Sequence, residues 1–179
     1  MQAQQQSGGR SVWRLDTSHS SVEFTTKKLL FFTVKGRLAV SEGTIVLDES
    51  FLPESSVKAT IKTASIDTGN QQRDSQLKAA NFLNVKTFPS IQFESVEVGP
   101  GRDRDMINVR GALTIKDNSR DVLLEVTEVD RSKAPGGDEV IYYVAEAELD
   151  RYQFGVSGWR GVISPKLKIV INVQANRCE

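Results

Sequence analysis

The residue types of a catalytic triad stand together near the start of the chain, in the stretch LDTSHSS. Asp16, Ser18, His19 and Ser20 offer an acid, a histidine and two hydroxyl groups. A triad needs groups that converge from different parts of a fold, whereas neighbours on a strand point to opposite faces. We therefore interpret His19 as a side chain whose ring nitrogens hydrogen-bond to nearby backbone, and we expect no catalytic residue here.

The sequence gives little indication of a site for a metal or a cofactor. His19 is the only histidine, which excludes a site with several histidine ligands. The chain has no nucleophile elbow, no Walker loop and no dinucleotide-binding fingerprint. We expect neither a metal nor a cofactor.

The pair Arg73 and Asp74 is a second group of charges that chemistry could use. Three roles stay open: a buried ion pair, a helix-capping device, or a contact with the head group of a ligand. An acid–base role would need a second positioned group, which the sequence does not supply. We favour a structural role, because the helix macrodipole stabilises an acidic residue near a helix start.

The stretch around this pair, NQQRDSQLKAANFLNVKTFP, does not alternate as its surroundings do. It predicts one short helix near residues 70–83, with Thr68 as N-cap and Gln71 three residues later in a capping-box pattern. Pro89 forbids the helix from continuing. The apolar side of this helix must cover part of the rest of the fold.

Two further stretches have two interpretations each. FGVSGWRG (Phe154–Gly161) is either a flexible loop or a loop at a cavity mouth, with Trp159 as an amphipathic lip and Arg160 as an anion contact. LLFF (Leu29–Phe32) is either core or an exposed apolar rim, which would mark an interaction or ligand-entry site.

The elements that must position these residues are strands. Apolar and polar residues alternate with period two, which is typical of a strand with one buried face. We expect about eight to ten strands, within residues 21–27, 32–40, 43–49, 55–63, 90–98, 106–116, 120–130, 139–150 and 166–175, with Ser41-Glu42-Gly43 as a hairpin loop. No strand–helix–strand rhythm appears, so an all-β sandwich or barrel is favoured over a parallel α/β sheet.

The composition narrows the class further. A hydrophobic fraction of 39% and a charged fraction of 26% are typical of a soluble globular domain. Basic and acidic residues balance at 23 each, so we expect no nucleic-acid partner. Cys178 is the only cysteine and excludes an internal disulfide.

The ends and the apolar runs set further expectations. No run approaches the roughly 20 apolar residues of a membrane-spanning helix. Residues 1–11 are rich in Gln, Ser and Gly and are expected to form a disordered tail. The chain as given indicates a cytoplasmic protein, or a periplasmic one if a signal peptide has been removed.

Several separated stretches, in order, resemble the YceI-like family of polyisoprenoid-binding, lipocalin-like proteins. They are LDTSHSSVEF, VKGRL, GTIVLD, the long SVKATIKTASIDTGNQQRDSQLKAANFLNVKTFPSIQFES, VRGALTIKDNSRDVLLEV and DRYQFGVSGW, and they span about Trp13 to Ala175. The turn after ALTI departs from the family pattern, since it is Lys116-Asp117-Asn118-Ser119. The resemblance implies an antiparallel barrel whose interior holds a long isoprenoid or similar amphiphile, often in a dimer.

We therefore expect an all-β, lipocalin-like antiparallel barrel of about eight strands with one short helix, as a single domain over residues 12–176. The expected function is non-enzymatic binding of a long apolar lipid (a polyisoprenoid, an isoprenoid quinone or a fatty-acid-like amphiphile), as a carrier, store or sensor. A homodimer is possible. The hypothesised ligand contacts are Phe24, Ile61, Leu77, Phe82, Phe93, Leu113 and Phe154 for the tail, Arg73 and Arg160 for the head group, and Trp159 at the lip.

Two alternatives belong to other classes. An enzyme acting on a small amphiphile at the barrel mouth, around His19 or Arg73, would need a polar pocket with converging titratable groups. A protein-interaction module would bind its partner through the Leu29–Phe32 rim.

Overall fold

A computed structural model of the chain describes residues 9–179; residues 1–8, most of the expected tail of residues 1–11, lie outside that range. The described part contains the strands β1 (Ser11–Leu15), β2 (Ser21–Lys28), β3 (Phe32–Leu47), β4 (Ser56–Asp67), β5 (Ser90–Pro100), β6 (Met106–Ile115), β7 (Asn118–Lys133), β8 (Glu139–Asp150) and β9 (Lys166–Arg177). Its helical segments are η1 (Leu52–Glu54), α1 (Gln71–Leu77) and η2 (Arg151–Phe154).

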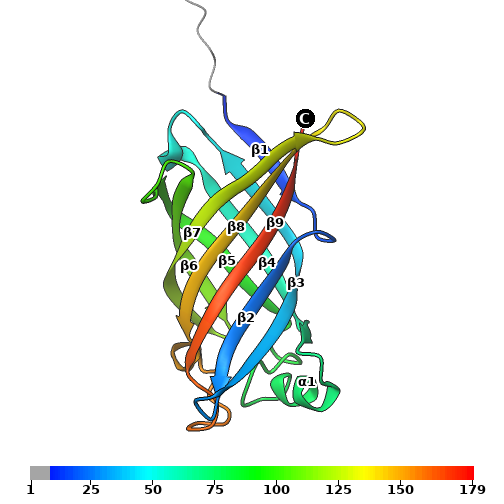
Figure 1. The fold of residues 1–179 in the computed structure, drawn as a ribbon, viewed down its shortest axis with the longest axis vertical. Coiled ribbons are helices and arrows are strands. Elements are labelled where there is room, and N and C mark those ends of the chain that lie inside the picture. Colours follow the sequence, from blue (N-terminus) through cyan, green and yellow to red (C-terminus); the bar gives the residue numbers. More distant parts are fainter. Residues whose placement is uncertain (1–8) are drawn as a thin grey trace, which may run out of the picture.

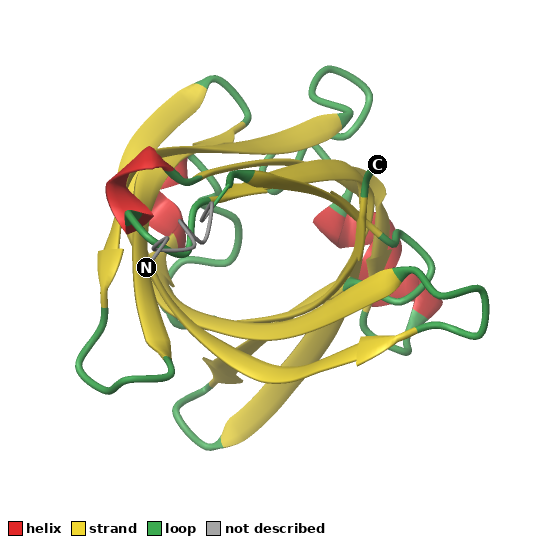
Figure 2. Cartoon of the chain, turned by 90° about the horizontal axis from the view of Figure 1, so that it is seen from above, coloured by secondary structure: helices red, strands yellow, loops and turns green. Residues whose placement is uncertain are grey.

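The strands form one closed antiparallel barrel with eight strand positions (Figure 1). The sheet runs in the order β1-β3-β2-β9-β8-β7-β6-β5-β4, and pairing of β3 with β4 closes it. β1 and β2 share one position: β1 pairs with residues 44–47 of β3 and 175–177 of β9, whereas β2 pairs with residues 32–39 and 168–172 of the same strands. Figure 2 shows the ring of strands from above. The predicted barrel of about eight strands with one short helix is confirmed.

Period-two alternation determines which side chains face the barrel interior. In β9, Leu167, Ile169, Ile171 and Val173 all line the interior, as their alternation predicts. In β5 the register against β6 shifts between Ser95 and Glu97. A β-bulge of this kind changes which later residues face inward.

The predicted hairpin loop at Ser41-Glu42-Gly43 is wrong. β3 continues through these residues, and its register against β4 shifts between Val40 and Glu42, which marks a bulge. Gly43 is buried, and a Cβ added there would lie 2.7 Å from Cδ2 of Leu15. The glycine therefore permits a close approach of the neighbouring strand β1 instead of making a turn.

The helix begins and ends elsewhere than predicted. α1 covers Gln71–Leu77 only, and turns follow it up to residue 87. The N-cap is Asn70, whose side chain accepts a hydrogen bond from the backbone N–H of Arg73 at 3.0 Å, so the predicted cap at Thr68 is wrong. Thr68 instead donates its own N–H and hydroxyl to Asp74 Oδ1, at 2.9 and 2.6 Å.

The connections define two ends of the barrel (Figure 1). The α1 end, at the bottom of the figure, is formed by residues 29–31, 68–89, 116–117 and 151–165, which include α1 and η2. The C-terminal end, at the top, is formed by residues 48–55, 101–105 and 134–138, which include η1. Within residues 9–179, none of the helices is long and apolar enough to cross a membrane.

Candidate functional site: an apolar cavity inside the barrel

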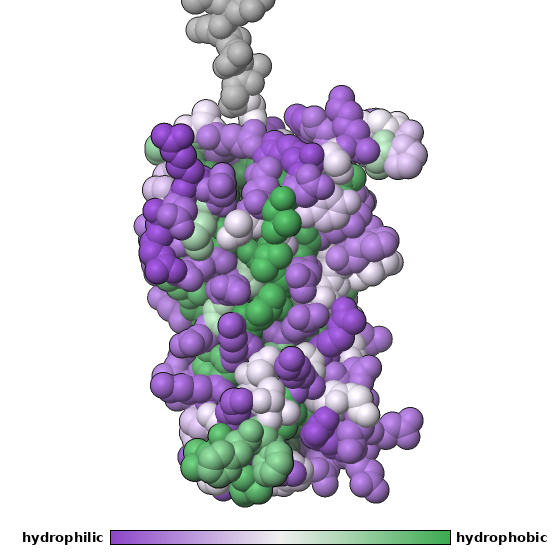
Figure 3. Space-filling model, viewed as in Figure 1, coloured by the Kyte–Doolittle hydropathy of each residue, from purple (hydrophilic) through white to green (hydrophobic). Residues whose placement is uncertain are grey.

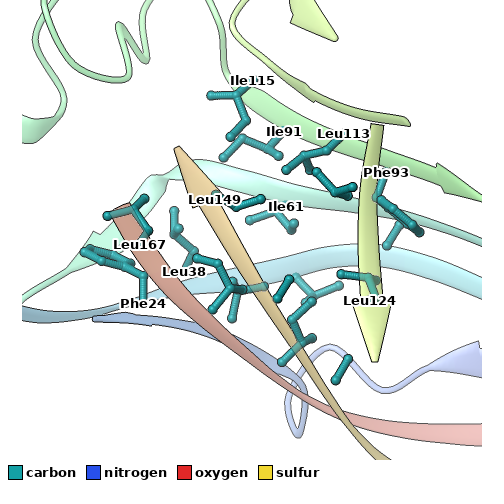
Figure 4. Close-up of a pocket in the computed structure, with 18 of the residues that line it drawn as sticks. Phe24, Leu38, Ile61, Ile91, Phe93, Leu113, Ile115, Leu124, Leu149 and Leu167 are labelled. Atoms are coloured by element: carbon teal, nitrogen blue, oxygen red, sulfur yellow. The ribbon is translucent and has the colours of Figure 1, made fainter. Parts of the chain in front are cut away.

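The barrel encloses a cavity of about 250 Å³. Every strand contributes to its wall, because each turns one face of its alternating pattern inward. Figure 4 labels ten of the lining residues: Phe24, Leu38, Ile61, Ile91, Phe93, Leu113, Ile115, Leu124, Leu149 and Leu167. Among the described residues, the polar or ionisable groups of the lining are Thr26, Ser55, Arg73, Tyr143 and Arg151.

All seven residues hypothesised as tail contacts line this cavity. Phe24, Ile61, Phe93 and Leu113 lie on β2, β4, β5 and β6 and form part of the wall. Leu77 ends α1, Phe82 follows it, and Phe154 ends η2, so these three approach from the α1 end.

Trp159 and Arg160, the hypothesised lip and anion contact, lie beside the cavity and are outside its lining. The Trp159 ring stands edge-on to the ring of Phe82, with centroids 5.8 Å apart and an angle of 88° between the planes. The Arg160 guanidinium stacks 4.1 Å from the ring centroid of Tyr152. Trp159 therefore supports a lining residue from outside, and Arg160 is engaged by an aromatic ring.

Arg151 is a lining residue that the sequence analysis missed. Its side chain is 4% exposed, and its guanidinium donates to four backbone carbonyls: those of Val156 and Gly158 at 2.8 Å, Ile163 at 2.8 Å and Ser164 at 3.2 Å. Burial lowers the pKa of this guanidinium. Arg151 thus holds the loop of residues 155–164 in place across the α1 end.

A signal for Arg151 does exist in the sequence. The glycine-rich stretch that follows it lies between two strands, so its carbonyls have no ladder partners and need another donor. Arginine offers five donors in a fixed arrangement, which suits several carbonyls at once. Nothing in the sequence pattern shows that the guanidinium turns inward to meet them.

Arg73 and Asp74 both converge on Thr68 and do not pair with each other. Arg73 Nε donates to Thr68 Oγ1 at 2.7 Å, and Nη2 donates to the Thr68 carbonyl at 2.7 Å. Asp74 accepts from the same residue on its other side. Arg73 lines the cavity, whereas Asp74 lies outside the lining. Of the three roles considered, the ion pair is absent among the described residues, and Asn70 is the cap. Asp74 ties the start of α1 to the preceding Thr68.

The triad-like stretch forms the short connection between β1 and β2. His19 Nδ1 and Asp16 Oδ2 are 2.9 Å apart, and the same carboxylate accepts from the backbone N–H of Ser18 at 2.9 Å. The hydrogen bond with His19 is the largest cause that holds the pKa of Asp16 below its usual value. His19 is exposed and lies outside the cavity lining, so His19 and Arg73 do not meet. The expected bond from His19 to backbone is replaced by a side-chain bond.

The C-terminal end of the interior is filled by buried side chains. Trp13 is 1% exposed and Ile141 and Ala175 are fully buried. Arg131 lies with its guanidinium 6.0 Å from the Trp13 ring centroid and donates to Glu128 at 3.0 Å. Below this layer the Tyr143 side chain lines the cavity, and burial is the main cause that raises the pKa of its hydroxyl.

Comparisons with known proteins agree with this architecture. A family model described as the YceI-like domain matches residues 13–175. Protein YceI of Salmonella newport (strain SL254) is 29% identical over 156 residues, which cover 87% of this chain and 81% of the relative. The crystal structure of BcnA from Burkholderia cenocepacia matches with a TM-score of 0.79 and 22% identity, over 89% of this chain and 98% of that one.

A further solved structure shares the fold. A polyisoprenoid binding domain from Saccharophagus degradans matches with a TM-score of 0.64 and 13% identity, over 93% of this chain and 98% of that chain. At such identities the structural matches establish a common barrel. The family model covers nearly all of the described barrel, from Trp13 in β1 to Ala175 in β9. The chain therefore belongs to the family of proteins with a YceI-like domain.

Proposed function

We propose that this protein binds a long apolar lipid inside its barrel and acts as a carrier, store or sensor of that lipid. A polyisoprenoid, an isoprenoid quinone and a fatty-acid-like amphiphile all fit the proposal. The observation that carries it is the cavity of about 250 Å³ inside the barrel, whose wall is almost entirely apolar. Family membership and the shared fold with a polyisoprenoid binding domain support it.

The energetics favour an apolar chain as the occupant. Burial of each CH₂ group contributes about 0.8 kcal/mol, so one five-carbon isoprene unit contributes about 4 kcal/mol. A cavity of about 150 Å³ lined by similar side chains takes up benzene and otherwise stays dry. A larger cavity of the same character favours an apolar ligand over water, and it requires little polar recognition.

Arg73 is the residue we propose for the polar end of the ligand. It lines the cavity at the α1 end, and its Nε and Nη2 are occupied by Thr68. Among residues 9–179, no hydrogen-bond partner is recorded for its Nη1. The other lining arginine, Arg151, uses its donors on backbone carbonyls and is less suited to a ligand.

We propose a binding protein and not an enzyme. The enzymatic alternative requires titratable groups that converge on one pocket. His19 lies in the β1–β2 connection, away from the lining that contains Arg73. The polar groups of the lining are distributed between the two ends of the barrel, which suits a ligand with a long apolar body.

The test combines lipid identification with binding. Organic extraction of the purified protein followed by mass spectrometry is expected to release a long-chain lipid. The delipidated protein is then titrated with geranylgeraniol and with dansyl-labelled undecanoic acid. Absence of bound lipid together with failure to bind either probe would contradict the proposal.

A cavity-filling variant provides the matched control. Ala147 lines the cavity on β8, so Ala147→Phe adds a ring to the space that the ligand would fill. Ala64 is exposed on β4, and Ala64→Phe adds the same ring outside. We expect the first variant to weaken both probes at least tenfold and the second to leave them unchanged. Equal binding by both variants would place the lipid elsewhere.

The head-group assignment has its own test. Arg73→Gln is expected to weaken the carboxylate probe while leaving the neutral alcohol geranylgeraniol nearly unaffected. Arg160→Gln tests the second head-group prediction in the same assay. If Arg73→Gln weakens both probes equally, its role is to shape the α1 end and it does not contact the head group.

A further inference from the structure

The connection between β2 and β3 is a strongly exposed apolar tip. Leu29, Leu30, Phe31 and Phe32, which we call the LLFF tip, are 50%, 84%, 82% and 63% exposed. Leu30 and Phe31 are the two most exposed large hydrophobic side chains of the described part. None of the four lines the cavity. Of the two interpretations of this stretch, the exposed apolar rim is correct and the core is wrong.

The backbone of the tip adopts an unfavourable conformation to present these side chains. Leu29 and Leu30 have φ angles of 51° and 68°. This left-handed region brings Cβ too close to the following carbonyl oxygen. It is normally taken by glycine, which has no Cβ, or by asparagine and aspartate, whose side chains hydrogen-bond locally. Such outliers concentrate at functional sites when the surroundings impose them. The turn therefore keeps two leucines where residues better suited to the turn would make it more stable.

A second connection extends the apolar surface at the same end. The backbone N–H of Leu29 donates to the carbonyl of Val162 at 2.8 Å, and Lys28 forms a bridge with Ile163. Val162 and Trp159 are each 37% exposed. The LLFF tip and this loop together contain six of the eleven exposed large hydrophobic residues of the described part. Figure 3 shows the resulting hydrophobic cluster at the lower end of the molecule.

Charge is segregated between the two ends of the barrel. Apart from the buried Arg151, the connections of the α1 end carry five basic residues and two acidic ones: Arg73, Lys78, Lys86, Lys116 and Arg160 against Asp74 and Asp117. The connections of the C-terminal end show the opposite balance: Asp48, Glu49, Glu54, Asp103, Asp105 and Asp138 against Arg102 and Arg104. The chain as a whole is neutral, so the α1 end is a basic pole and the C-terminal end is an acidic pole.

Basic residues also adjoin the LLFF tip directly. Lys27 and Lys28 precede it, and residues 24–41 contain no acidic residue. Residues 151–178, which include the neighbouring loop, contain none either. Three features favour binding of a protein surface to the interface of an anionic bilayer. They are apolar side chains at a protruding tip, an amphipathic tryptophan, and lysines and arginines around them.

We propose that the α1 end docks on the surface of a bilayer that contains anionic phospholipid, with the LLFF tip inserted between the head groups. A second copy of the chain in a two-fold symmetric pair fits this surface less well, because two basic ends would then face each other. Docking in this orientation places Arg73 and the α1 side of the cavity next to the membrane. The docking itself does not depend on a lipid being bound inside the barrel.

Vesicle co-sedimentation tests the docking. The purified protein is mixed with phosphatidylcholine vesicles, with and without phosphatidylglycerol. We expect binding to the vesicles that contain phosphatidylglycerol, and weaker binding when the salt concentration is raised. Leu30→Glu with Phe31→Glu is expected to weaken binding at least about a hundredfold, since two apolar side chains leave the interface. Lys27→Gln with Lys28→Gln is expected to weaken it about tenfold or more.

Two controls separate docking from folding. Phe51 is 56% exposed at the C-terminal end, so Phe51→Glu makes the same change on the opposite pole and is expected to bind as the wild type does. Leu29→Asn with Leu30→Gly relieves the left-handed backbone, so this variant is expected to be more stable than the wild type and yet to lose vesicle binding. Uptake of dansyl-labelled undecanoic acid from solution is measured in parallel and is expected to be unchanged.

The outcomes are distinct. Equal binding of the wild type to neutral and anionic vesicles, or unaltered binding by the Leu30→Glu/Phe31→Glu variant, would overturn the proposal. A different result would also overturn it: the wild type forms a dimer and does not bind vesicles, and the Leu30→Glu/Phe31→Glu variant is a monomer. The tip would then be a protein interface. If neither the wild type nor any variant takes up the dansyl probe, that result counts against lipid binding inside the barrel and not against docking.

Discussion

The ring of Phe82 packs directly against the backbone of Gly158, and a Cβ added at Gly158 would lie 2.6 Å from Cζ of Phe82. The backbone N–H of Gly158 also donates to the carbonyl of Asn81 at 2.8 Å. This contact joins the segment after α1 to the loop after η2, so the two connections close the α1 end as one unit. Arg151 holds the same loop from inside through its bonds to backbone carbonyls.

Gly158→Ala is expected to destabilise the protein by about 1–3 kcal/mol, because the added methyl group overpacks against Phe82. The loss is measured by urea unfolding. Gly158→Ala combined with Phe82→Leu is expected to cost less than the sum of the two single changes, since the clash is shared. Gly99→Ala is the control, as nothing lies within 4 Å of its added Cβ. If the losses of the two single variants simply add up in the double variant, the Phe82 ring does not clash with the methyl group added at position 158.

Arg151→Met is expected to cost about 3 kcal/mol or more, because it removes the donor for several buried carbonyls, each worth about 1–3 kcal/mol when left unsatisfied. Hydrogen exchange or limited proteolysis within residues 155–164 is expected to increase more than in the strands. Arg160→Met, which removes an exposed stacking interaction with Tyr152, is expected to change stability by only about 1 kcal/mol or less. Similar losses from both changes would contradict the role given to Arg151.

Leu29→Asn with Leu30→Gly is expected to raise the free energy of unfolding by about 1–2 kcal/mol, since the left-handed conformation costs about that much per ordinary residue. Urea or thermal unfolding measures the gain. The control is Leu123→Asn, an exposed change in the middle of β7 where no positive φ angle is relieved. A loss of stability in the double variant would mean that the leucines pack on their neighbours more than their exposure indicates.

The connection of residues 48–55 is expected to weaken in acid. Asp48 Oδ1 accepts from the Ser50 hydroxyl at 2.6 Å and from the backbone N–H groups of Phe51 and Ser50 at 2.9 and 3.0 Å. These bonds, the hydroxyl foremost, hold the pKa of Asp48 below its ordinary value. Its contribution is present above the unfolded pKa of about 3.9 and is lost as the pH falls through the lower folded pKa.

Asp48→Asn is therefore expected to flatten the pH dependence of stability below about pH 4. Urea unfolding over an acid pH series measures the effect. Asp103→Asn serves as the control, because within the described residues no hydrogen bond of its side chain is recorded. If the two variants lose stability in parallel with the wild type as the pH falls, the Asp48 carboxylate is not responsible.

Much of the cavity wall could be predicted from alternation alone. Phe24, Ile61, Phe93 and Leu113 were expected to face inward, and all four line the cavity. The reason is that successive residues of a strand point to opposite faces, whatever the partners of that strand are. The short helix was predicted for a similar reason, since its lack of alternation is a local property, but α1 ends at Leu77, well before Pro89.

Features that depend on contacts distant in sequence could not be predicted. Ser41-Glu42-Gly43 has the composition of a turn, but Gly43 is needed where Leu15 of the neighbouring strand β1 packs closely on β3. The inward turn of Arg151 depends on where the carbonyls of its loop lie.

The sequence by itself determined most of the strands, their inward faces and the all-β class, because these follow from local periodicity. Its ordered motifs indicated the family, and with it the barrel. Only the tertiary structure decided that β1 and β2 share one barrel position, that Arg73 and not Arg160 reaches the cavity, and that the LLFF tip is exposed. Each of these depends on which distant segments meet when the sheet closes, and alternation along one strand contains no information about that closure.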